Sequence, residues 1–177
     1  MPAEAVPDVR SPLDLGSFND LTDDQASRVL QACCASSAWV SRVRAARPYE
    51  TAEQLLDTAD RECRQLSAAD VDEALAAHPR IGDRAQGAST EATWSRQEQA
   101  PVADAGPATR ERLREGNIAY EARFDRVFLV RAAGRTLAQL LAELERRLGN
   151  DPATESREVV EQLAQITRLR VERLLAP

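Results

Sequence analysis

His78 is the only histidine of the 177-residue chain, and it opens the run HPRIGD. Imidazole accepts and donates a proton near neutral pH without a large shift of its pKa, so His78 is the first candidate for acid–base chemistry. Pro79 ends a preceding helix and Gly82-Asp83 favours a tight turn, which places His78 at a rim, where functional groups are often displayed. The alternative is a structural histidine that, as a cation, caps the carbonyl end of a helix.

Glu98 is the second candidate and lies in the run SRQEQ, residues 95–99. A carboxylate beside His78 would fix the tautomer of the imidazole and favour its protonated form. The alternative is that Ser95 and Glu98 form an S-x-x-E capping box, which begins many ordinary helices. The spacing of the two residues does not distinguish these interpretations.

Arg170 is the third candidate, because it interrupts the apolar stripe of the last expected helix. That stripe consists of Val159, Leu163, Ile166 and Leu174. Arg170 lies on the same helical face, whereas Arg168 lies on the polar face. A buried guanidinium needs an anionic or carbonyl partner. Arg170 therefore binds a ligand, pairs with an internal acid, or extends along the edge of the stripe toward solvent.

Charge and composition argue against several classes of function. The 23 basic residues, all arginine, face 29 acidic ones, and the net charge of −6 argues against nucleic-acid binding. No apolar run approaches the roughly 18 residues of a membrane helix, and the N-terminus lacks the apolar core of a secretory signal, so we expect a cytoplasmic protein. We interpret Cys33, Cys34 and Cys63 as reduced apolar residues. With one histidine and no Cys-x-x-Cys pair, we expect no metal site.

The elements that must position these candidates are helices. The pattern predicts an all-α fold, a single-domain bundle of about seven to nine helices, with residues 1–16 as an N-terminal leader and residues 17–177 as the helical domain. N-cap signals predict helix starts at Thr22, Thr51, Ser67 and Thr136. Further helices are predicted over 37–44 and 95–103, from Pro107, and from Thr154 to about Leu175.

Two segments are predicted to lack helix. Residues 82–94 contain glycine and small polar residues and predict a loop. Val127–Val130 is a short apolar run with no second run to pair with. We therefore expect an extended buried segment there and not a strand of a sheet.

Taken together, the motifs resemble the 2-oxo-4-hydroxy-4-carboxy-5-ureidoimidazoline (OHCU) decarboxylase family, whose members catalyse the last step from urate to (S)-allantoin. The resemblance covers nearly the whole chain. Its motifs are FNDL, CCASSAWV, ARPY, HPRIGD, SRQEQ, NIAYEARF with the apolar run after it, GRTLAQLLAELERRLGND and ITRLRVERLL. The resemblance implies an all-α fold, usually a homodimer, that acts on the small molecule OHCU without a cofactor or metal.

The resemblance also implies which residues form the site. His78 and Glu98 are the implied catalytic pair. The implied substrate-binding residues are Pro79, Ser95, Arg96, Gln97, Gln99, Phe128, Leu129, Val130, Arg131, Ala132 and Arg170. Because Arg168 is close to the last of these, either arginine fits the family's late arginine. We expect His78 to donate the proton, Glu98 to orient it, and Arg170 with Gln99 to anchor the substrate.

Two positions depart from the family pattern. Asp125-Arg126 follows Phe124 where the family usually has Phe-Gly and an aromatic residue or histidine, which removes the easy access of glycine to positive φ. Pro101 stands where the family often has glycine, and it is expected to kink or end the preceding helix. The alternatives to this decarboxylase are a helical ligand-binding module of the same fold without catalysis and a decarboxylase of a related ureido acid.

Overall fold

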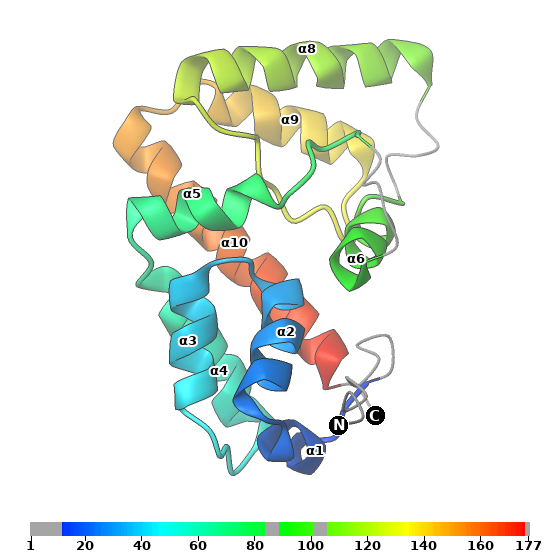
Figure 1. The fold of residues 1–177 in the computed structure, drawn as a ribbon. Helices are drawn as coiled ribbons and strands as arrows, with labels where there is room; N and C mark the ends of the chain where they lie inside the picture. The colour runs from blue at the N-terminus through cyan, green and yellow to red at the C-terminus, as the bar shows by residue number, and fades with distance from the viewer. Residues whose placement is uncertain (1–11, 84–88, 101–105, 176–177) are drawn as a thin grey trace.

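The computed structural model describes residues 12–83, 89–100 and 106–175 (Figure 1). Within these ranges the structure has nine helices and no strand, so the predicted all-α fold is confirmed. The first five helices are α1 (Leu15–Asp20), α2 (Asp23–Cys33), α3 (Ser37–Ala45), α4 (Ala52–Arg64) and α5 (Ala68–Ala76). The others are α6 (Thr90–Glu98), α8 (Pro107–Phe124), α9 (Leu137–Arg147) and α10 (Pro152–Leu174).

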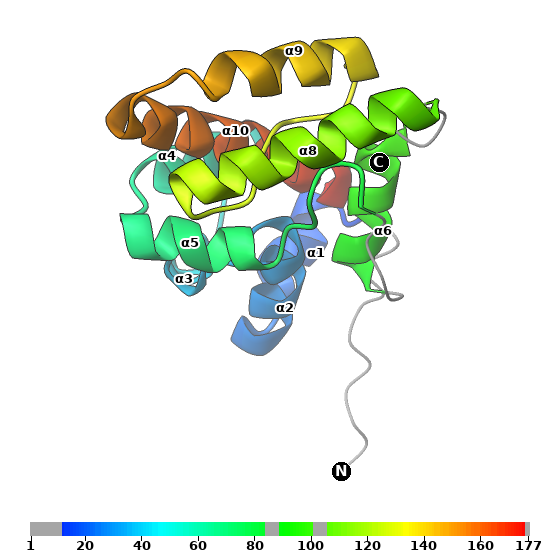
Figure 2. The same ribbon diagram turned by 90° about the horizontal axis from the view of Figure 1, so that it is seen from above.

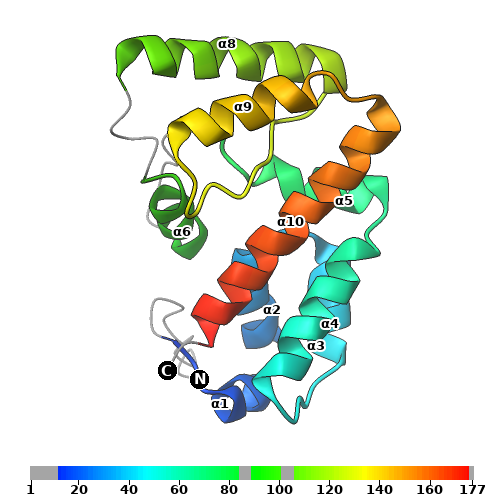
Figure 3. The same cartoon turned by 180° about the vertical axis from the view of Figure 1, so that it is seen from behind.

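The helices form two groups that α10 connects. The pair α8 and α9 lies at one end of the molecule and α1 to α4 lie at the other, while α10 runs from the first group along α4 into the second (Figures 1 and 3). In the view from above, α5 lies beneath one end of α8 and α6 beneath the other (Figure 2). The long α10 therefore carries residues from one group to the other.

The apolar core has two parts, and an extended segment joins them. The larger cluster is formed mainly by α1 to α6 and α10, and the smaller by α8, α9 and Ile81. Val127 and Leu129 pack in the larger cluster. The residues of the segment that pack in the smaller cluster are Phe128, Val130 and Ala132. Successive side chains of an extended chain point to opposite sides, and here they pack alternately into the two clusters. The predicted extended conformation is therefore confirmed.

The helix starts follow the capping signals in most places. The side chains of Thr22, Thr51, Ser67 and Thr136 each accept a hydrogen bond from the backbone N–H three residues later, as predicted. The last helix begins earlier than predicted, because the N-cap is Asp151, whose carboxylate accepts from two backbone N–H groups. The helix α1 begins at Leu15, inside the segment expected to be a leader.

The prediction for residues 82–94 is partly wrong. Residues 90–94 are the first turns of α6, and its N-cap is Ser89, whose side chain accepts from the N–H of Ala92. Burial of Ala92 and Trp94 outweighs the loop-like composition. Ser95 is consequently inside the helix, so it is not the start of a capping box. The helix α6 ends at Glu98, and residues 101–103 of the predicted helix lie outside the described residues.

The departure at Asp125 does not prevent a positive φ. Asp125 is the C-cap of α8 and has φ 53°, in the left-handed region. Aspartate tolerates this region better than most residues other than glycine, so the expected loss of this conformation is wrong. The other departure, Pro101, lies outside the described residues.

Candidate active site

A cleft of about 440 Å³, measured to its open mouth, lies where the two groups of helices meet. Four parts of the chain form it: residues 78–81, the face of α6 that ends in Glu98 and Gln99, the extended segment 128–133, and the middle of α10. The predicted site residues that line the cleft are His78, Pro79, Ser95, Glu98, Gln99, Phe128, Leu129, Val130, Arg131, Ala132 and Arg170. The structure thus brings together residues up to 92 positions apart (170 minus 78).

Arg96 and Gln97 are the two predicted site residues that do not line this cleft. Gln97 is exposed, and the guanidinium of Arg96 donates to the hydroxyl of Thr93. The reason is helical geometry, because residues three and four apart share a face and the intervening ones point elsewhere. The run SRQEQ therefore presents Ser95, Glu98 and Gln99 to the cleft.

His78 follows directly after the C-cap of α5 and is 9% exposed. Its Nδ1 lies 2.9 Å from the carbonyl oxygen of Ala74, and its Nε2 is buried with no hydrogen-bond partner in the described part of the chain. A carbonyl oxygen only accepts, so Nδ1 carries the proton and Nε2 is the accepting nitrogen of a neutral ring. Burial, and next the charge of Arg170, lower the pKa of His78 from 6.5 to about 4.

The structural interpretation of His78 is therefore half right. The ring does cap a carbonyl at the end of α5, but it does so as a neutral donor and not as a cation. The same hydrogen bond leaves Nε2 unprotonated at neutral pH. In this form Nε2 of His78 must accept a proton before it can donate one.

Glu98 binds two arginines. Arg170 donates from Nε to Oε1 at 3.1 Å and from Nη2 to Oε2 at 2.9 Å, and Arg173 donates to Oε1 at 3.0 Å. Arg170 is 1% exposed, and its Nη2 also donates to the hydroxyl of Ser95 at 3.1 Å. The expectation that Glu98 fixes the tautomer of His78 is wrong, because the carbonyl of Ala74 does so. Arg170 is instead the buried partner of an internal acid, one of the alternatives for it.

The pair of arginines gives the cleft a positive character. Two guanidinium groups share one carboxylate at Glu98, which leaves an excess of one positive charge beside a neutral His78. Within the described ranges the hydrogen bonds of Arg170 come from its Nε and Nη2 groups, and Nη1 makes none there. Arg168, the other arginine considered, pairs with Glu53 at 2.9 Å, away from the cleft. The arrangement suits a small anion with carbonyl or hydroxyl groups.

Gln99 holds the turn that follows His78. Its Oε1 accepts from the N–H of Gly82 at 2.8 Å, and its Nε2 donates to the carbonyl of Arg80 at 3.5 Å. Gly82 has φ 95°, which favours glycine at this position. From the other side, the amide of Asn117 donates to the carbonyl of Ile81 at 2.9 Å. The motifs HPRIGD and SRQEQ are therefore linked through the turn as well as through the cleft.

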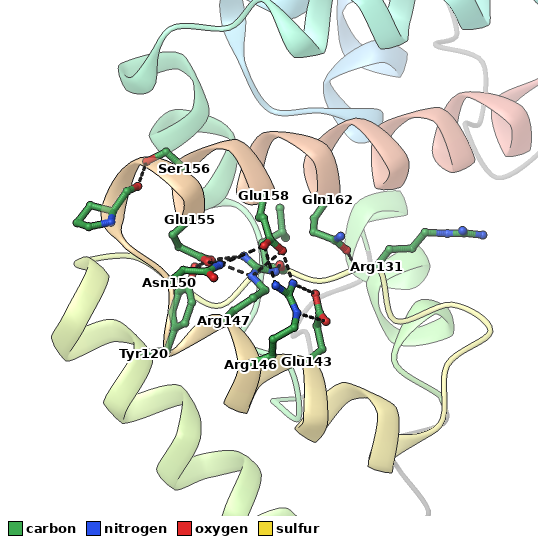
Figure 4. A network of polar contacts seen from close by, with 12 residues as sticks. Tyr120, Arg131, Glu143, Arg146, Arg147, Asn150, Glu155, Ser156, Glu158 and Gln162 are labelled. Atoms are coloured by element: carbon green, nitrogen blue, oxygen red, sulfur yellow. Dashed lines mark hydrogen bonds and ion pairs between the residues drawn. The ribbon is translucent and has the colours of Figure 1, made fainter.

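Two buried residues hold the extended wall of the cleft from behind (Figure 4). Arg147, on α9, donates from Nη1 to the carbonyl of Leu129 at 2.7 Å, and its guanidinium lies 4.8 Å from the ring centre of Phe128. Gln162, on α10, accepts from the N–H of Arg131 at 2.9 Å. Glu155 fixes Arg147 through a hydrogen bond of 2.9 Å to its Nε. The backbone of the wall is thus fixed at two neighbouring points.

The sequence patterns did not predict roles for Arg147, Glu155 and Gln162. A signal exists for Arg147, because it continues the stripe of Leu140 and Leu144 on the buried face of α9, as Arg170 does on α10. Arg173, the second partner of Glu98, lies seven residues after Ile166 and three after Arg170, so helical spacing places it on the same side of α10.

Two negative findings apply to the described ranges. They contain no helix long and apolar enough to cross a membrane. They also contain no group of three or more His, Cys, Asp or Glu residues arranged to hold a metal ion.

Comparisons with known proteins agree with this geometry. A crystal structure of OHCU decarboxylase in the presence of (S)-allantoin superposes with a TM-score of 0.72 at 27% identity and covers 89% of this chain and 100% of that one. A 2-oxo-4-hydroxy-4-carboxy-5-ureidoimidazoline decarboxylase of Haloferax volcanii is 26% identical over 160 residues, 90% of this chain and 94% of the relative. The uric acid degradation bifunctional protein TTL of Arabidopsis thaliana is 30% identical over 149 residues, but this chain spans only 46% of its length. The family model for OHCU decarboxylase matches residues 19–172, and the chain therefore belongs to the OHCU decarboxylase family.

Proposed function

We propose that this chain decarboxylates OHCU to (S)-allantoin in urate degradation, and that His78, Glu98 and Arg170 carry the reaction. The observation that carries the assignment of these residues is that one cleft is lined by His78, whose buried Nε2 has no hydrogen-bond partner among the described residues, and by the Glu98–Arg170 pair. Ser95, Gln99 and the wall of residues 128–132 complete the proposed substrate site. Binding of OHCU follows from the positive excess of the cleft, because the substrate is a carboxylate.

The reaction needs an electron sink and not a cofactor. In OHCU, ring carbon C4 carries both the hydroxyl and the carboxylate, and C5 is part of an imine. When the bond from C4 to the carboxylate breaks, its electron pair forms a double bond between C4 and C5, and the imine electrons move to the ring nitrogen. The Nη1 donors of Arg170 stabilise the charge that develops on the ring. Arg173 and Ser95 hold the Glu98–Arg170 pair in place.

The second stage moves protons. The enol left after CO₂ loss becomes a ketone when the 4-hydroxyl group gives up its proton and C5 gains one. His78 is suited to take the hydroxyl proton on Nε2 and to return a proton to one face of C5, which makes one enantiomer. Glu98 acts in this proposal through Arg170, whose position it fixes, and not through direct contact with His78.

Circular dichroism tests the function. OHCU is generated in place from urate by urate oxidase and hydroxyisourate hydrolase, and the optical activity of allantoin is followed with and without this protein. The proposal predicts (S)-allantoin at a rate well above the uncatalysed control. An equal rate would overturn it, and ligand binding without turnover would point to a binding module of the same fold.

The resemblance also suggests a homodimer in the cytoplasm, and we propose both as parts of this function. Light scattering during size-exclusion chromatography tests the oligomeric state. A mass near twice the 19.5 kDa of the chain supports the dimer, and a mass near one chain contradicts it.

A further inference from the structure

His78 forms part of the wall of two cavities. The second one measures about 570 Å³ to its mouth and lies between the end of α5 and the first turns of α6. It shares His78, Pro79 and Ser95 with the substrate cleft. Among the described residues that line it, only His78 and Glu91 have ionisable side chains.

Glu91 lies in the first turn of α6 and is half-buried. Within the described ranges its carboxylate makes no hydrogen bond or ion pair. Burial raises its pKa, while the charge of Arg170 lowers it and that of Glu98 raises it. The charge of Glu98 on α6 and that of Arg170 on α10 therefore act on the pKa of Glu91 in opposite directions. Burial is the largest effect, so the pKa of Glu91 is raised. Such a carboxyl group holds a proton at higher pH than a free one.

The reaction proposed above consumes one proton from solvent in each turnover. A carboxylate that leaves as CO₂ takes no proton with it, and the electron pair that it leaves behind must be protonated. The hydroxyl proton that His78 transfers to C5 does not meet this need, because it was already part of the substrate. Nε2 of His78 is buried, so solvent does not reach it directly.

We propose that Glu91 is the group through which this solvent proton enters, by way of the second cavity, and reaches His78. After Nε2 has passed the hydroxyl proton to C5, the O–H bond of protonated Glu91 breaks and an N–H bond forms at Nε2, directly or through water. That N–H bond then breaks as the proton moves to the ring nitrogen, which holds the electron pair left by CO₂, and Glu91 is protonated again from solvent. No electron is transferred in this step. The inference rests on the proposed function, because only a decarboxylation creates this demand for a proton.

The test is Glu91→Gln in the full chain, with the circular dichroism assay at pH 7.5. We expect kcat to fall roughly tenfold or more with little change in KM, because proton delivery is lost while substrate binding is kept. A small buffer acid that is partly protonated at this pH, such as imidazole, should restore the rate in proportion to its concentration. Glu91→Asp should retain most of the rate and show no such buffer dependence. It also provides the test if the glutamine variant does not fold.

Asp24→Asn is the matched control. Asp24 occupies the same position in the first turn of α2 that Glu91 occupies in α6, but it is exposed and lines neither of the two cavities. It should leave kcat unchanged. An unchanged kcat in Glu91→Gln, or a loss that no buffer acid restores, would overturn the role of Glu91 while the proposed function stands. A wild-type protein without activity would overturn both.

Discussion

The charge state of His78 leads to the most quantitative prediction. Burial and the neighbouring Arg170 lower its pKa from 6.5 to about 4. Since one pKa unit corresponds to about 1.4 kcal/mol, charging the imidazole in the folded protein costs about 3 kcal/mol more than charging it in the unfolded chain. At pH 5.5 nearly all folded molecules should have a neutral ring, whereas at the usual pKa only roughly a tenth would.

Nitrogen NMR measures this directly, because the chain has a single histidine and therefore a single imidazole in the spectrum. A long-range ¹H–¹⁵N correlation experiment from pH 8 to pH 4 should show the ring protonated on Nδ1 and a titration midpoint near 4. His78→Asn identifies the signals by their loss. A midpoint near 6.5, or a ring protonated on Nε2, would show that His78 is not the buried neutral donor described above.

The same shift predicts how stability depends on pH. Below pH 6.5 the unfolded chain takes up a proton on His78 that the folded chain does not take up until about pH 4. Stability therefore falls as pH drops through this window, and the contribution of His78 is fully present above it. The free energy of unfolding, measured with urea at pH 7 and at pH 4.5, should fall between these two pH values in the wild type. In His78→Asn this fall should be smaller by about 2 to 3 kcal/mol.

The other predictions concern α10. Arg170→Lys should lower kcat/KM by roughly one to two orders of magnitude, because lysine cannot form the two-point contact with Glu98, whereas Arg168→Lys should stay within about twofold. The assay is steady-state circular dichroism, and similar losses in both variants would contradict the assignment of Arg170. Gln162→Met leaves the N–H of Arg131 without its acceptor, so it should lower the unfolding free energy by about 1 to 3 kcal/mol and raise KM more than it lowers kcat. Gln165→Met, on the outer side of the same helix, is the control. Equal effects of the two substitutions on the unfolding free energy and on KM would show that Gln162 does not hold the wall.

Local patterns predicted the starts of helices well where the N-cap side chain alone determines the start. The side chains of Thr22, Ser67 and Thr136 satisfy backbone N–H groups whatever the rest of the fold does, so their helices begin where the capping pattern placed them. Ser95 and Glu98 have the same spacing as a capping box, but here the spacing has a different physical reason. Both residues lie on one face of α6 and are buried where they line the cleft, so this spacing reflects a shared helical face and not a helix start.

The site could be predicted in part for the same reason. The burial of Arg170 follows from its place in the stripe of α10, which is a local pattern. Its partner could not be predicted from spacing, because Glu98 is 72 positions earlier in the chain and meets it only through the packing of α6 beside α10. The tautomer of His78 depends on the carbonyl of Ala74, and this bond forms only because the helix ends between them.

The most direct test of the account compares the wild type with His78→Asn in a single turnover, with enzyme in excess over OHCU. Asparagine can replace the hydrogen bond to the carbonyl of Ala74, but it cannot transfer a proton. We expect rapid formation of optically active (S)-allantoin by the wild type and, in the folded variant, a rate close to that of the uncatalysed reaction. If the folded variant formed (S)-allantoin at the wild-type rate, His78 would not carry the proton.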